Sequence, residues 1–493
     1  MTPRRAFLLA LVGFFLLGGA WAVSLPVNGT YDESQHIVRA YAAVDMQWPP
    51  DGPNRQSFDV PATLLPANPE CMHEDKDAYR PASCLRPRTG RGDVSTETYV
   101  ARYNPLYYLA VGLPIRLWPD TTGIVLARLL SALLCAVMLA AAVGIAVTQG
   151  NRMLAAAVAL VATPMVVDLA GSVNPNGLEI CAGVLLFASG LGLIRDGTAP
   201  RKSLLACAAV AAFVLVVVRH IGPLLLVIDL AALAALAGPA ATKAVARRRD
   251  VWAWLGGGAL AGLVAYGGWL LLARSPVGPG PGEPTDLGAG GILRGLLTDR
   301  FRFYVQQIVG QFGYGETTMS PLAIALWYGL VAAVVLPAAW RAGWRVRAVL
   351  AGLVVAGVGM LVALEFYFVP TEGWFSHGRY ALPVLVGVVL IAAASSDSGA
   401  GDVRTPWWLP PALVLATAPV HLYALTRVLS RYREGIDASL VPFGGSWAPP
   451  VPAPVALIAV LVGVGAVAAA TMMTVRDDSG TDNRASTRTV SAN

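Results

Sequence analysis

The sequence predicts an all-α membrane protein with about twelve transmembrane helices. Of its 493 residues, 56% are hydrophobic and only 13% are charged, a composition outside the range of soluble globular proteins. The apolar residues gather in runs of roughly 17 to 25 residues, the length that a helix needs to cross a bilayer. The charged residues fall mostly between these runs, and no basic run is long enough to indicate nucleic-acid binding.

Twelve apolar stretches qualify as spans. They cover residues 6–26, 122–148, 152–170, 175–195, 203–218, 221–238, 251–273, 321–340, 347–369, 380–396, 406–426 and 453–474. If they alternate from a cytoplasmic Arg4-Arg5, most short basic connections lie in the cytoplasm, as the positive-inside rule requires. We therefore expect a multi-pass plasma-membrane protein with both termini in the cytoplasm. Two basic segments, Arg219-His220 and residues 427–433, fall on the external side in this arrangement. They are exceptions to the positive-inside rule.

The first span, within residues 1–26, has two interpretations. Arg4-Arg5, an apolar core and Ala20-Trp21-Ala22 resemble a secretory signal peptide with a small-residue cleavage site. We favour an uncleaved transmembrane anchor, because the apolar run is long for a signal peptide and a charged motif follows it directly.

Most of the polar chain is predicted to lie outside the membrane. Residues 27–104 form a large external loop with many Pro and Asp residues, which predicts a small external subdomain. Cys71 and Cys84 are the two cysteines of this loop, and in an oxidising compartment a disulfide between them is expected.

The rest of the chain divides in the same way. Residues 105–273 and 321–474 are two transmembrane bundles, separated by the external segment 274–320. This segment opens with a Gly/Pro-rich linker and continues into apolar residues at helical spacing over 292–312, which predicts an interfacial helix. The tail, residues 475–493, is polar and is predicted to be a disordered cytoplasmic segment.

A charged motif follows the first span, from Tyr31 to Tyr41. If it is helical, Asp32 and Glu33 lie within one turn of His36, and Arg39 follows a turn later. One face then carries acid, imidazole and guanidinium groups. The opposite face is apolar and would lay the helix along the membrane surface, through Ile37, Ala40, Tyr41 and Val44.

This combination of side chains suits a substrate that is part lipid and part phosphate. Arginine donates two hydrogen bonds to phosphate oxygens, and a carboxylate accepts a proton from an attacking hydroxyl or holds a divalent cation. Asp32, Glu33 and His36 are also candidate ligands of a divalent metal ion, Mg or Mn. The alternative is a salt-bridged helix start with no catalytic role.

Further ionisable residues near the apolar spans collect on the same side of the membrane. They are Asp168, Glu179, Arg219, His220, Glu365, His377 and Arg379. Caps and snorkelling side chains also explain such residues one by one, but their clustering favours a site. Arg128 and Asp229 lie deeper, and we expect a structural partner for each.

Motifs for nucleotide-driven chemistry are missing from the sequence, which has no Walker loop and no Gly-rich turn between a strand and a helix. An activated donor on the external side is therefore expected to be linked to a lipid.

Four separated motifs resemble those of the bacterial membrane family called domain of unknown function 2142, in the same order. The segment Tyr31-Asp32-Glu33 with His36 and Arg39-Ala40-Tyr41 is similar to its P-D-E-x-x-H-x-x-R-A-Y signature. The other three are Tyr103-Asn104-Pro105 with Tyr107, the stretch from Gly310 to Thr317 with Pro321, and Gly378-Arg379-Tyr380 with Pro383. The resemblance covers about residues 6–400. Tyr31 replaces the usual Pro, Tyr314 a Trp and Glu316 an Asp.

The layout of that family resembles the GT-C glycosyltransferases, which place an acidic motif just after the first helix and use polyprenyl-phosphate sugars. The resemblance implies Asp32 as general base, with Glu33 as its support or a metal contact and His36 beside them. The expected substrate-binding residues are Arg39, Tyr107, Glu316, Arg219, His377 and Arg379, of which the last three are inferred from charge and side to hold the donor phosphate.

The implied reaction moves a sugar from a polyprenyl phosphate to a glycan or lipid acceptor of the cell envelope, with inversion. A transporter or flippase of lipid-linked sugars is the first alternative, although the sequence shows none of the repeated halves that many transporters have. A non-catalytic envelope assembly protein is the second.

Overall fold

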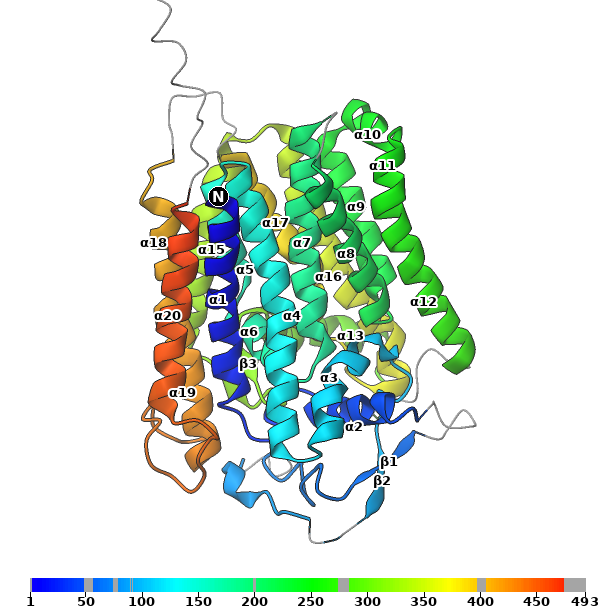
Figure 1. Cartoon of the computed structure of the whole chain (residues 1–493), viewed down its shortest axis with the longest axis vertical. Coiled ribbons are helices and arrows are strands. Elements are labelled where there is room, and N and C mark those ends of the chain that lie inside the picture. The colour runs from blue at the N-terminus through cyan, green and yellow to red at the C-terminus, as the bar shows by residue number, and fades with distance from the viewer. Residues whose placement is uncertain are drawn as a thin grey trace, which may run out of the picture.

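The computed structural model describes residues 2–47, 56–73, 79–88, 90, 92–197, 201–273, 283–396 and 405–473. The predicted disordered tail, 475–493, and residues 274–282 of the predicted linker lie outside the described residues. Long helices run side by side through the molecule (Figure 1). One end of this bundle carries α2, β1 and β2 and is called here the α2 end; the N-terminus lies at the other, the N-terminal end.

Within the described chain, nine helical stretches are long and apolar enough to cross a membrane. They are α1 (Thr2–Ala22), α4 (Thr121–Thr148), α7 (Pro175–Asp196), α11 to α12 (Arg249–Ala273), α15 (Pro321–Arg341), α16 (Trp344–Glu372), η4 with α17 (Gly378–Ser396), α18 with α19 (Leu409–Glu434) and α20 (Ala453–Thr471). The predicted class, an all-α polytopic membrane protein, is confirmed.

Three of the twelve predicted spans are irregular. The span 152–170 is a bent pair, in which α5 (Arg152–Val161) meets α6 (Pro164–Ala170) at 72°. The span 221–238 is α9 (Gly222–Ala237), which meets the following α10 (Pro239–Ala246) at 119°. A third, α8 (Lys202–Val218), has only 17 residues. The described chain therefore has nine spans, or eleven if each bent pair counts as one.

The break between α5 and α6 follows from local sequence. Pro164 has no amide hydrogen to donate and is favoured at the first position of a helix. Thr163 caps the new helix by accepting from the amide of Val166 at 3.3 Å, and its hydroxyl donates to the carbonyl of Ile308. The bend carries Asp168 to the first external loop, where Thr30 donates to its carboxylate at 2.8 Å.

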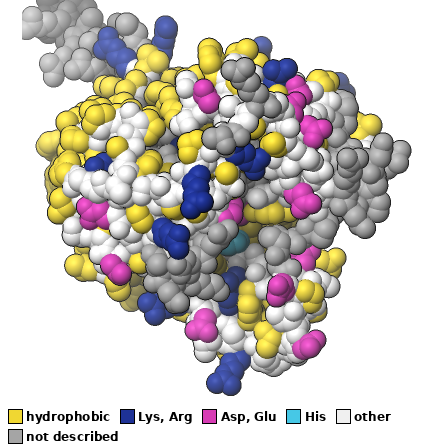
Figure 2. All heavy atoms as spheres, turned by 90° about the horizontal axis from the view of Figure 1, so that it is seen from below, with side chains coloured by type: hydrophobic (Ala, Val, Ile, Leu, Met, Phe, Trp, Pro, Cys, Tyr) yellow, Lys and Arg dark blue, Asp and Glu magenta, His cyan; other side chains and the backbone are white. Residues whose placement is uncertain are grey.

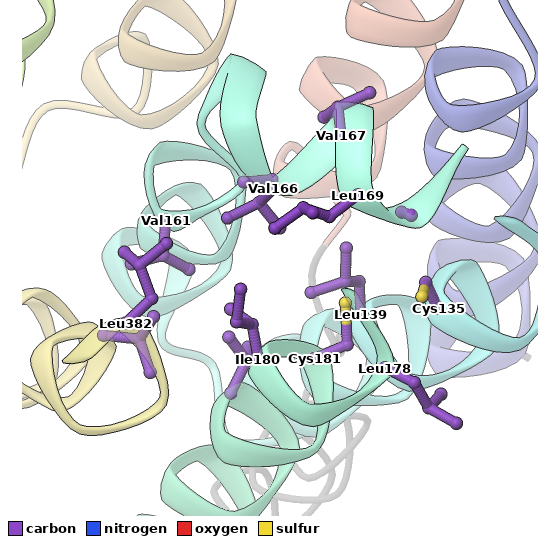
Figure 3. Packing of buried hydrophobic residues seen from close by; sticks show 14 of the residues in the cluster. Cys135, Leu139, Val161, Val166, Val167, Leu169, Leu178, Ile180, Cys181 and Leu382 are labelled. Atoms are coloured by element: carbon purple, nitrogen blue, oxygen red, sulfur yellow. The ribbon is translucent and has the colours of Figure 1, made fainter. Parts of the chain in front are cut away.

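The core lies between α4, α5, α6, α7 and α17 (Figure 3). Small and branched side chains from these helices are buried against one another, among them Cys135, Leu139, Val161, Ile180 and Leu382. Because this core spans the bundle's interior, it gives the α2 end a rigid base.

The subdomain predicted to be external is built from α2 (Glu33–Val44), β1 (Ser57–Pro61), η1 (Ala82–Cys84), β2 (Asp93–Glu97) and α3 (Pro105–Leu117). β1 and β2 pair antiparallel, with Ser57 opposite Glu97 and Pro61 opposite Asp93. The apolar face of α2 was predicted to lie on the membrane surface, but protein covers it. The helix packs against α3 and β1, so both its apolar and its charged faces are buried.

The predicted interfacial helix at 292–312 is divided into α13 (Ala289–Gly295), the π-helical turn η3 (Leu296–Arg300) and α14 (Phe301–Val309). It ends at Gly310, before the hairpin of β3 (Gln311–Phe312) and β4 (Thr317–Thr318). Ile292 and Leu296 are buried, whereas Leu297 and Phe301 are 73% and 64% exposed. The segment thus has one apolar face on the protein and another available to lipid.

Candidate functional site

Asp32 is held at the α2 end in an unusual conformation. It is the residue before α2 and adopts φ 61, in the left-handed region, which costs a residue other than glycine about 1–2 kcal/mol. Its side chain makes no capping hydrogen bond to the helix. Instead, Tyr99 donates its hydroxyl to Oδ1 at 2.6 Å, and Arg379 donates Nη2 to Oδ2 at 3.2 Å. The Asp32 side chain remains 24% exposed.

Tyr99 serves as a hydrogen-bond donor in this arrangement. Burial, and then the charge of Asp32, raise the pKa of Tyr99 well above its usual value. The phenol therefore keeps its proton at any physiological pH and directs one oxygen of Asp32.

Arg379 is the buried cation of the site. It lies in η4 (Gly378–Ala381), and its guanidinium carbon is 4.0 Å from the centroid of the Tyr31 ring. Its Nε has no hydrogen-bond partner among the described residues. The cation thus joins the Gly-Arg-Tyr motif to the Tyr-Asp-Glu motif, which lies more than three hundred residues earlier in the chain.

Gly378 allows this placement. A Cβ at this position would lie 2.5 Å from the carbonyl oxygen of Tyr304, which is too close for any other residue. η4 can therefore lie directly on α14, and Arg379 follows from that contact.

His377 is neutral in this setting. Gln307 Nε2 and Arg379 Nη1 lie 2.9 Å and 3.3 Å from its Nδ1. Because a guanidinium group only donates, this nitrogen must be the unprotonated acceptor. Burial, and then the charge of Arg379, hold the pKa of His377 well below its usual value. His377 adds no positive charge for a phosphate, contrary to the expectation from the sequence.

The hairpin between β3 and β4 brings the third motif to the site. Gly313 and Gly315 adopt φ 65 and 106 in its turn, which favour glycine. The turn places the Tyr314 hydroxyl 3.1 Å from Oδ1 of Asn28 and its ring 6.1 Å from that of Tyr31. The hairpin thus closes over the loop that leads to Asp32.

Glu316, expected to bind substrate, instead links three parts of the external surface. Its Oε1 is 3.2 Å from Nδ1 of His73 and 3.7 Å from Nη2 of Arg431, and its Oε2 accepts from the amide of Tyr314. Burial acts to raise the pKa of Glu316, but the hydrogen bond and charge of His73, a backbone hydrogen bond and the charge of Arg431 together lower that pKa below the usual value. Glu316 is therefore a buried link between the hairpin, the disulfide loop and α19.

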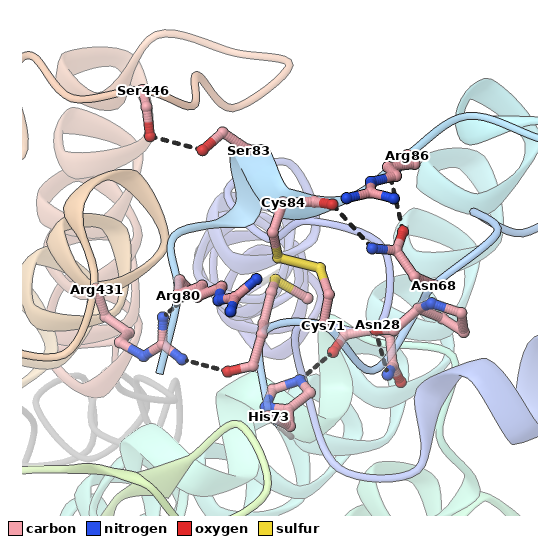
Figure 4. The surroundings of a disulfide bond; sticks show 12 residues. Asn28, Asn68, Cys71, His73, Arg80, Ser83, Cys84, Arg86, Arg431 and Ser446 are labelled. Atoms are coloured by element: carbon pink, nitrogen blue, oxygen red, sulfur yellow. Dashed lines mark hydrogen bonds between the residues drawn. A yellow bond between two sulfur atoms is a disulfide. The ribbon is translucent and has the colours of Figure 1, made fainter. Parts of the chain in front are cut away.

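The structure forms the predicted disulfide between Cys71 and Cys84 (Figure 4). Beside it, Arg431 of α19 donates to the carbonyls of Met72 and Arg80. These bonds give the basic segment 427–433 a structural role, since Arg431 holds the disulfide loop to the bundle.

Glu33 points away from Asp32. Both its oxygens accept from Arg128 of α4, at 2.7 Å from Nε and 2.5 Å from Nη2, and the side chain is fully buried. The structural partner expected for Arg128 is thus Glu33. The expectation that Glu33 supports Asp32 is not met, because the pair is committed to holding the first external loop on α4.

His36 and Arg39 are buried within the subdomain. His36 Nδ1 lies 2.8 Å from the Tyr108 hydroxyl, and burial lowers the pKa of His36 to about 3. Arg39 donates to the carbonyl of Tyr103 and lies 5.2 Å from the Trp269 ring. Tyr107 likewise bonds to Ser131. None of these side chains reaches the exposed oxygen of Asp32.

The predicted metal ligands do not converge. Asp32 bonds to Tyr99 and Arg379, Glu33 to Arg128, and His36 to Tyr108. In the part of the chain that the structure describes, no three His, Cys, Asp or Glu side chains form a group that could hold a metal ion. The donor set therefore does not fit the Mg or Mn site expected from the motif.

Arg219 lies one layer behind the site. Its Nη1 donates to Asn176 at 2.7 Å and to Glu179 at 3.2 Å, and its guanidinium carbon is 4.3 Å from the Tyr380 ring centroid. These partners account for the second basic exception to the positive-inside rule. Arg219 supports the residue next to Arg379.

Seen from the α2 end, acidic and basic side chains surround a recess in which a histidine is visible (Figure 2). Sequence reasoning missed Tyr99 and Gln307, which contact Asp32 and His377. The sequence around Tyr99 and Gln307 does not mark either as a site residue, because a single aromatic residue in a loop and a single amide in an amphipathic helix are both common. Tyr31 was noted only as a departure from the motif, yet it forms the surface on which Arg379 stacks.

The fold and this site define a helical membrane protein with a partly exposed carboxylate, held by a buried arginine, at one end of its bundle. The chain belongs to the family of predicted membrane proteins called domain of unknown function 2142 (DUF2142), whose model matches residues 15–388. The match contains all four motifs, so the resemblance inferred from them is confirmed.

Two solved structures are similar to this chain. One is the crystal structure of ArnT from Cupriavidus metallidurans bound to undecaprenyl phosphate, at 16% identity and a TM-score of 0.40, covering 95% of this chain and 77% of that chain. The other is ArnT from the same organism in the apo state, at 14% identity and a TM-score of 0.32, covering 89% and 76%. No curated protein matches the sequence. Activity has to be inferred from the site itself.

Proposed function

We propose that this protein is a membrane glycosyltransferase that moves a sugar from a polyprenyl-phosphate donor to a hydroxyl of a cell-envelope glycan or lipid. The observation that carries the proposal is the meeting of three family motifs at one partly exposed carboxylate, Asp32. Arg379 and Tyr99 orient this carboxylate, and Tyr314 covers the loop before it. Its place, just after the first helix, is the place of the catalytic acid in the GT-C layout that the motifs resemble.

Asp32 is the general base in this proposal. Its partly exposed carboxylate accepts the proton of the acceptor hydroxyl, whose oxygen bonds to the anomeric carbon from the face opposite the phosphate. The bond from that carbon to the phosphate oxygen breaks, and its electron pair leaves with the polyprenyl phosphate. General bases of this kind contribute about 10²–10⁴-fold to rate.

The choice of Asp32 over Glu33 follows from their partners. Glu33 is fully buried, and its two oxygens accept from Nε and Nη2 of Arg128. Asp32 is partly exposed, and Arg379 contacts only one of its oxygens. We further propose that the unpartnered Nε of Arg379 is the donor nearest to the leaving phosphate, where a fixed positive charge stabilises the transition state.

A second candidate function, transport of the lipid-linked sugar, is favoured by one feature. Asp229 of α9 is fully buried, and neither of its oxygens has a hydrogen-bond partner in the described chain. The structural partner expected for it is therefore not found. Isolated carboxyls inside spans often mark ion or proton pathways. Asp229→Asn should leave a transferase active but impair a proton-coupled transporter.

The experiment is an analysis of cell-envelope glycans in a deletion strain that expresses Asp32→Asn. Asparagine keeps the hydrogen-bond acceptor for Tyr99 and tolerates the left-handed backbone, so the fold should persist. The control is Asp45→Asn, because Asp45 is also on an end of α2, 28% exposed and paired with an arginine, Arg116 at 2.7 Å. We expect the control to restore a sugar that Asp32→Asn does not. Full restoration by Asp32→Asn would remove the basis of the proposal.

A further inference from the structure

The N-terminal end of the bundle, opposite Asp32, contains a cavity of about 700 Å³ that the site above does not use. It lies where α4, α7, α15 and α17 end and where α5 and α16 begin (Figure 1). This volume is within the usual range of ligand sites. By the positive-inside rule this end faces the cytoplasm.

Two arginines line the cavity. Arg195 is in the last turn of α7 and Arg341 in the last turn of α15. Neither has an ion pair or hydrogen bond among the described residues, and no Asp or Glu is among the described residues that line the cavity. The described part of the cavity wall therefore carries positive charge without a carboxylate to neutralise it.

Gln149 adds a buried donor. It ends α4, is only 9% exposed, and its Nε2 has no hydrogen-bond partner in the described chain. A Cβ at position 192 of α7 would lie 2.3 Å from this nitrogen. The glycine at this position therefore leaves room for the Gln149 amide group. Leaving a buried donor unpaired is unfavourable, and an oxygen of a bound ligand would satisfy it.

The first turn of α16 supplies further donors. Gly343, which lines the cavity, precedes this helix of 29 residues and has no side chain to cap it. The first backbone amides of a helix lack partners within the helix and sit at the positive end of its dipole. Such helix starts bind anions.

Arginines at helix ends also have a purely structural explanation, because they offset the negative end of the helix dipole. That explanation accounts for Arg195 and Arg341. It does not account for the cavity between them, nor for the buried, unpaired amide of Gln149.

We propose that this cavity binds the phosphate headgroup of an anionic phospholipid from the leaflet at the N-terminal end. Basic pockets between transmembrane helices on the cytoplasmic side bind such headgroups. A lipid fits better than free phosphate because an apolar groove of about 640 Å³ runs beside the cavity. Leu236 and Val346 line the cavity, and the preceding residue on each helix, Ala235 and Arg345, lines the groove. The groove is the seat of an acyl chain.

The test measures thermal melting of the purified protein in detergent with added phosphatidylglycerol, phosphatidylcholine or inorganic phosphate. We expect phosphatidylglycerol alone to raise the melting temperature of the wild type. Gln149→Glu puts a negative charge into the cavity at nearly constant shape, and the pair Arg195→Gln with Arg341→Gln removes two positive charges. Each of these two variants should raise the half-saturating concentration of phosphatidylglycerol about tenfold or more.

The matched control is Arg247→Gln with Arg249→Gln. Both arginines are exposed at the same end, outside the cavity, and the charge change equals that of the arginine pair. The control should bind phosphatidylglycerol like the wild type. If the control binds phosphatidylglycerol as weakly as the arginine pair variant, the lipid is attracted by surface charge only. If inorganic phosphate raises the melting temperature, no lipid is needed. If the cavity variants bind phosphatidylglycerol like the wild type, the lipid binds at a different site. Each of these results overturns the proposal.

Discussion

Two neighbouring carboxylates in this protein have opposite surroundings. Asp32 precedes α2 in a left-handed conformation and Glu33 is its first helical residue, so their side chains leave the chain in different directions. Asp32 points to the external surface and Glu33 to Arg128 in the bundle. The left-handed backbone of Asp32 is the residue-scale feature that separates a partly exposed carboxylate from a buried one.

The first prediction concerns this pair. Glu33→Gln should destabilise the protein by about 3 kcal/mol or more, because it leaves the Arg128 cation buried without a counter-charge. Asp32→Asn should cost less, because Arg379 donates to only one oxygen of Asp32, at 3.2 Å, and keeps its contact with the Tyr31 ring. Thermal melting of both purified variants measures the contrast. Equal melting temperatures would show that Glu33 is not the structural partner described here.

The sequence located the charged motif but not the direction of each side chain. Helical spacing states which residues share a face, not what covers that face. Glu33, His36 and Arg39 share the motif with Asp32, yet α3, α4 and β1 bury them. Tyr99 carries no local pattern, and only the closed loop brings its hydroxyl to Asp32. The motifs therefore located Asp32 and Arg379, but they did not show which of the neighbouring side chains meet these two residues.

At the scale of elements, close contacts of short segments build the site. η4 lies on α14 through Gly378, and the β3–β4 hairpin reaches the first loop through Tyr314. The spans that support these segments were predictable, because length and hydropathy alone define them. The bend after Val161 was not predicted as a break, although Pro164 follows it, whereas the end of α9 at Ala237 agrees with the predicted end of that span at residue 238. Apolar runs conceal such turns.

The second prediction concerns Gly378. Gly378→Ala would place a methyl group 2.5 Å from the Tyr304 carbonyl, so η4 must shift and carry Arg379 with it. We expect at least about a tenfold loss of transfer activity, since misplacement near 1 Å has costs of this order or larger. Gly329→Ala in α15 is the control, because no atom lies within 4 Å of that position. Wild-type activity of Gly378→Ala would mean that the position of η4 does not matter.

The third prediction concerns the disulfide loop. Cys71 and Cys84 are 13 residues apart, and closing a loop of this size stabilises a protein by about 3 kcal/mol. Replacing both by Ser should lower the melting temperature and free His73 from Glu316. The same change is expected in the wild type after reduction. A double variant that melts like the oxidised wild type would contradict the role of this link.

At the scale of the whole molecule, the α2 end is assembled around buried neutral histidines. Burial lowers the pKa of His36 to about 3 and, together with the charge of Arg219, that of His220 to about 4. An unfolded histidine binds a proton below about pH 6.5. Between these values the unfolded chain takes up protons that the folded chain does not.

The fourth prediction follows with its sign. Stability should be complete above about pH 6.5 and fall as the pH drops toward 4, by up to about 1.4 kcal/mol per pH unit for each such histidine. His36→Gln should show a shallower decline in melting temperature over this range than the wild type. An identical decline in both proteins would mean that His36 is not buried as a neutral ring.

The most direct test of the central claim is turnover by the purified protein in detergent micelles, where no membrane exists across which to transport. Lipids extracted from the deletion strain supply donor and acceptor, and mass spectrometry measures the released polyprenyl phosphate. The account predicts release by the wild type and by Asp45→Asn, and a loss of about 100-fold or more in Asp32→Asn. Equal release with Asp32→Asn, or lipid movement in membranes without release in micelles, would contradict it.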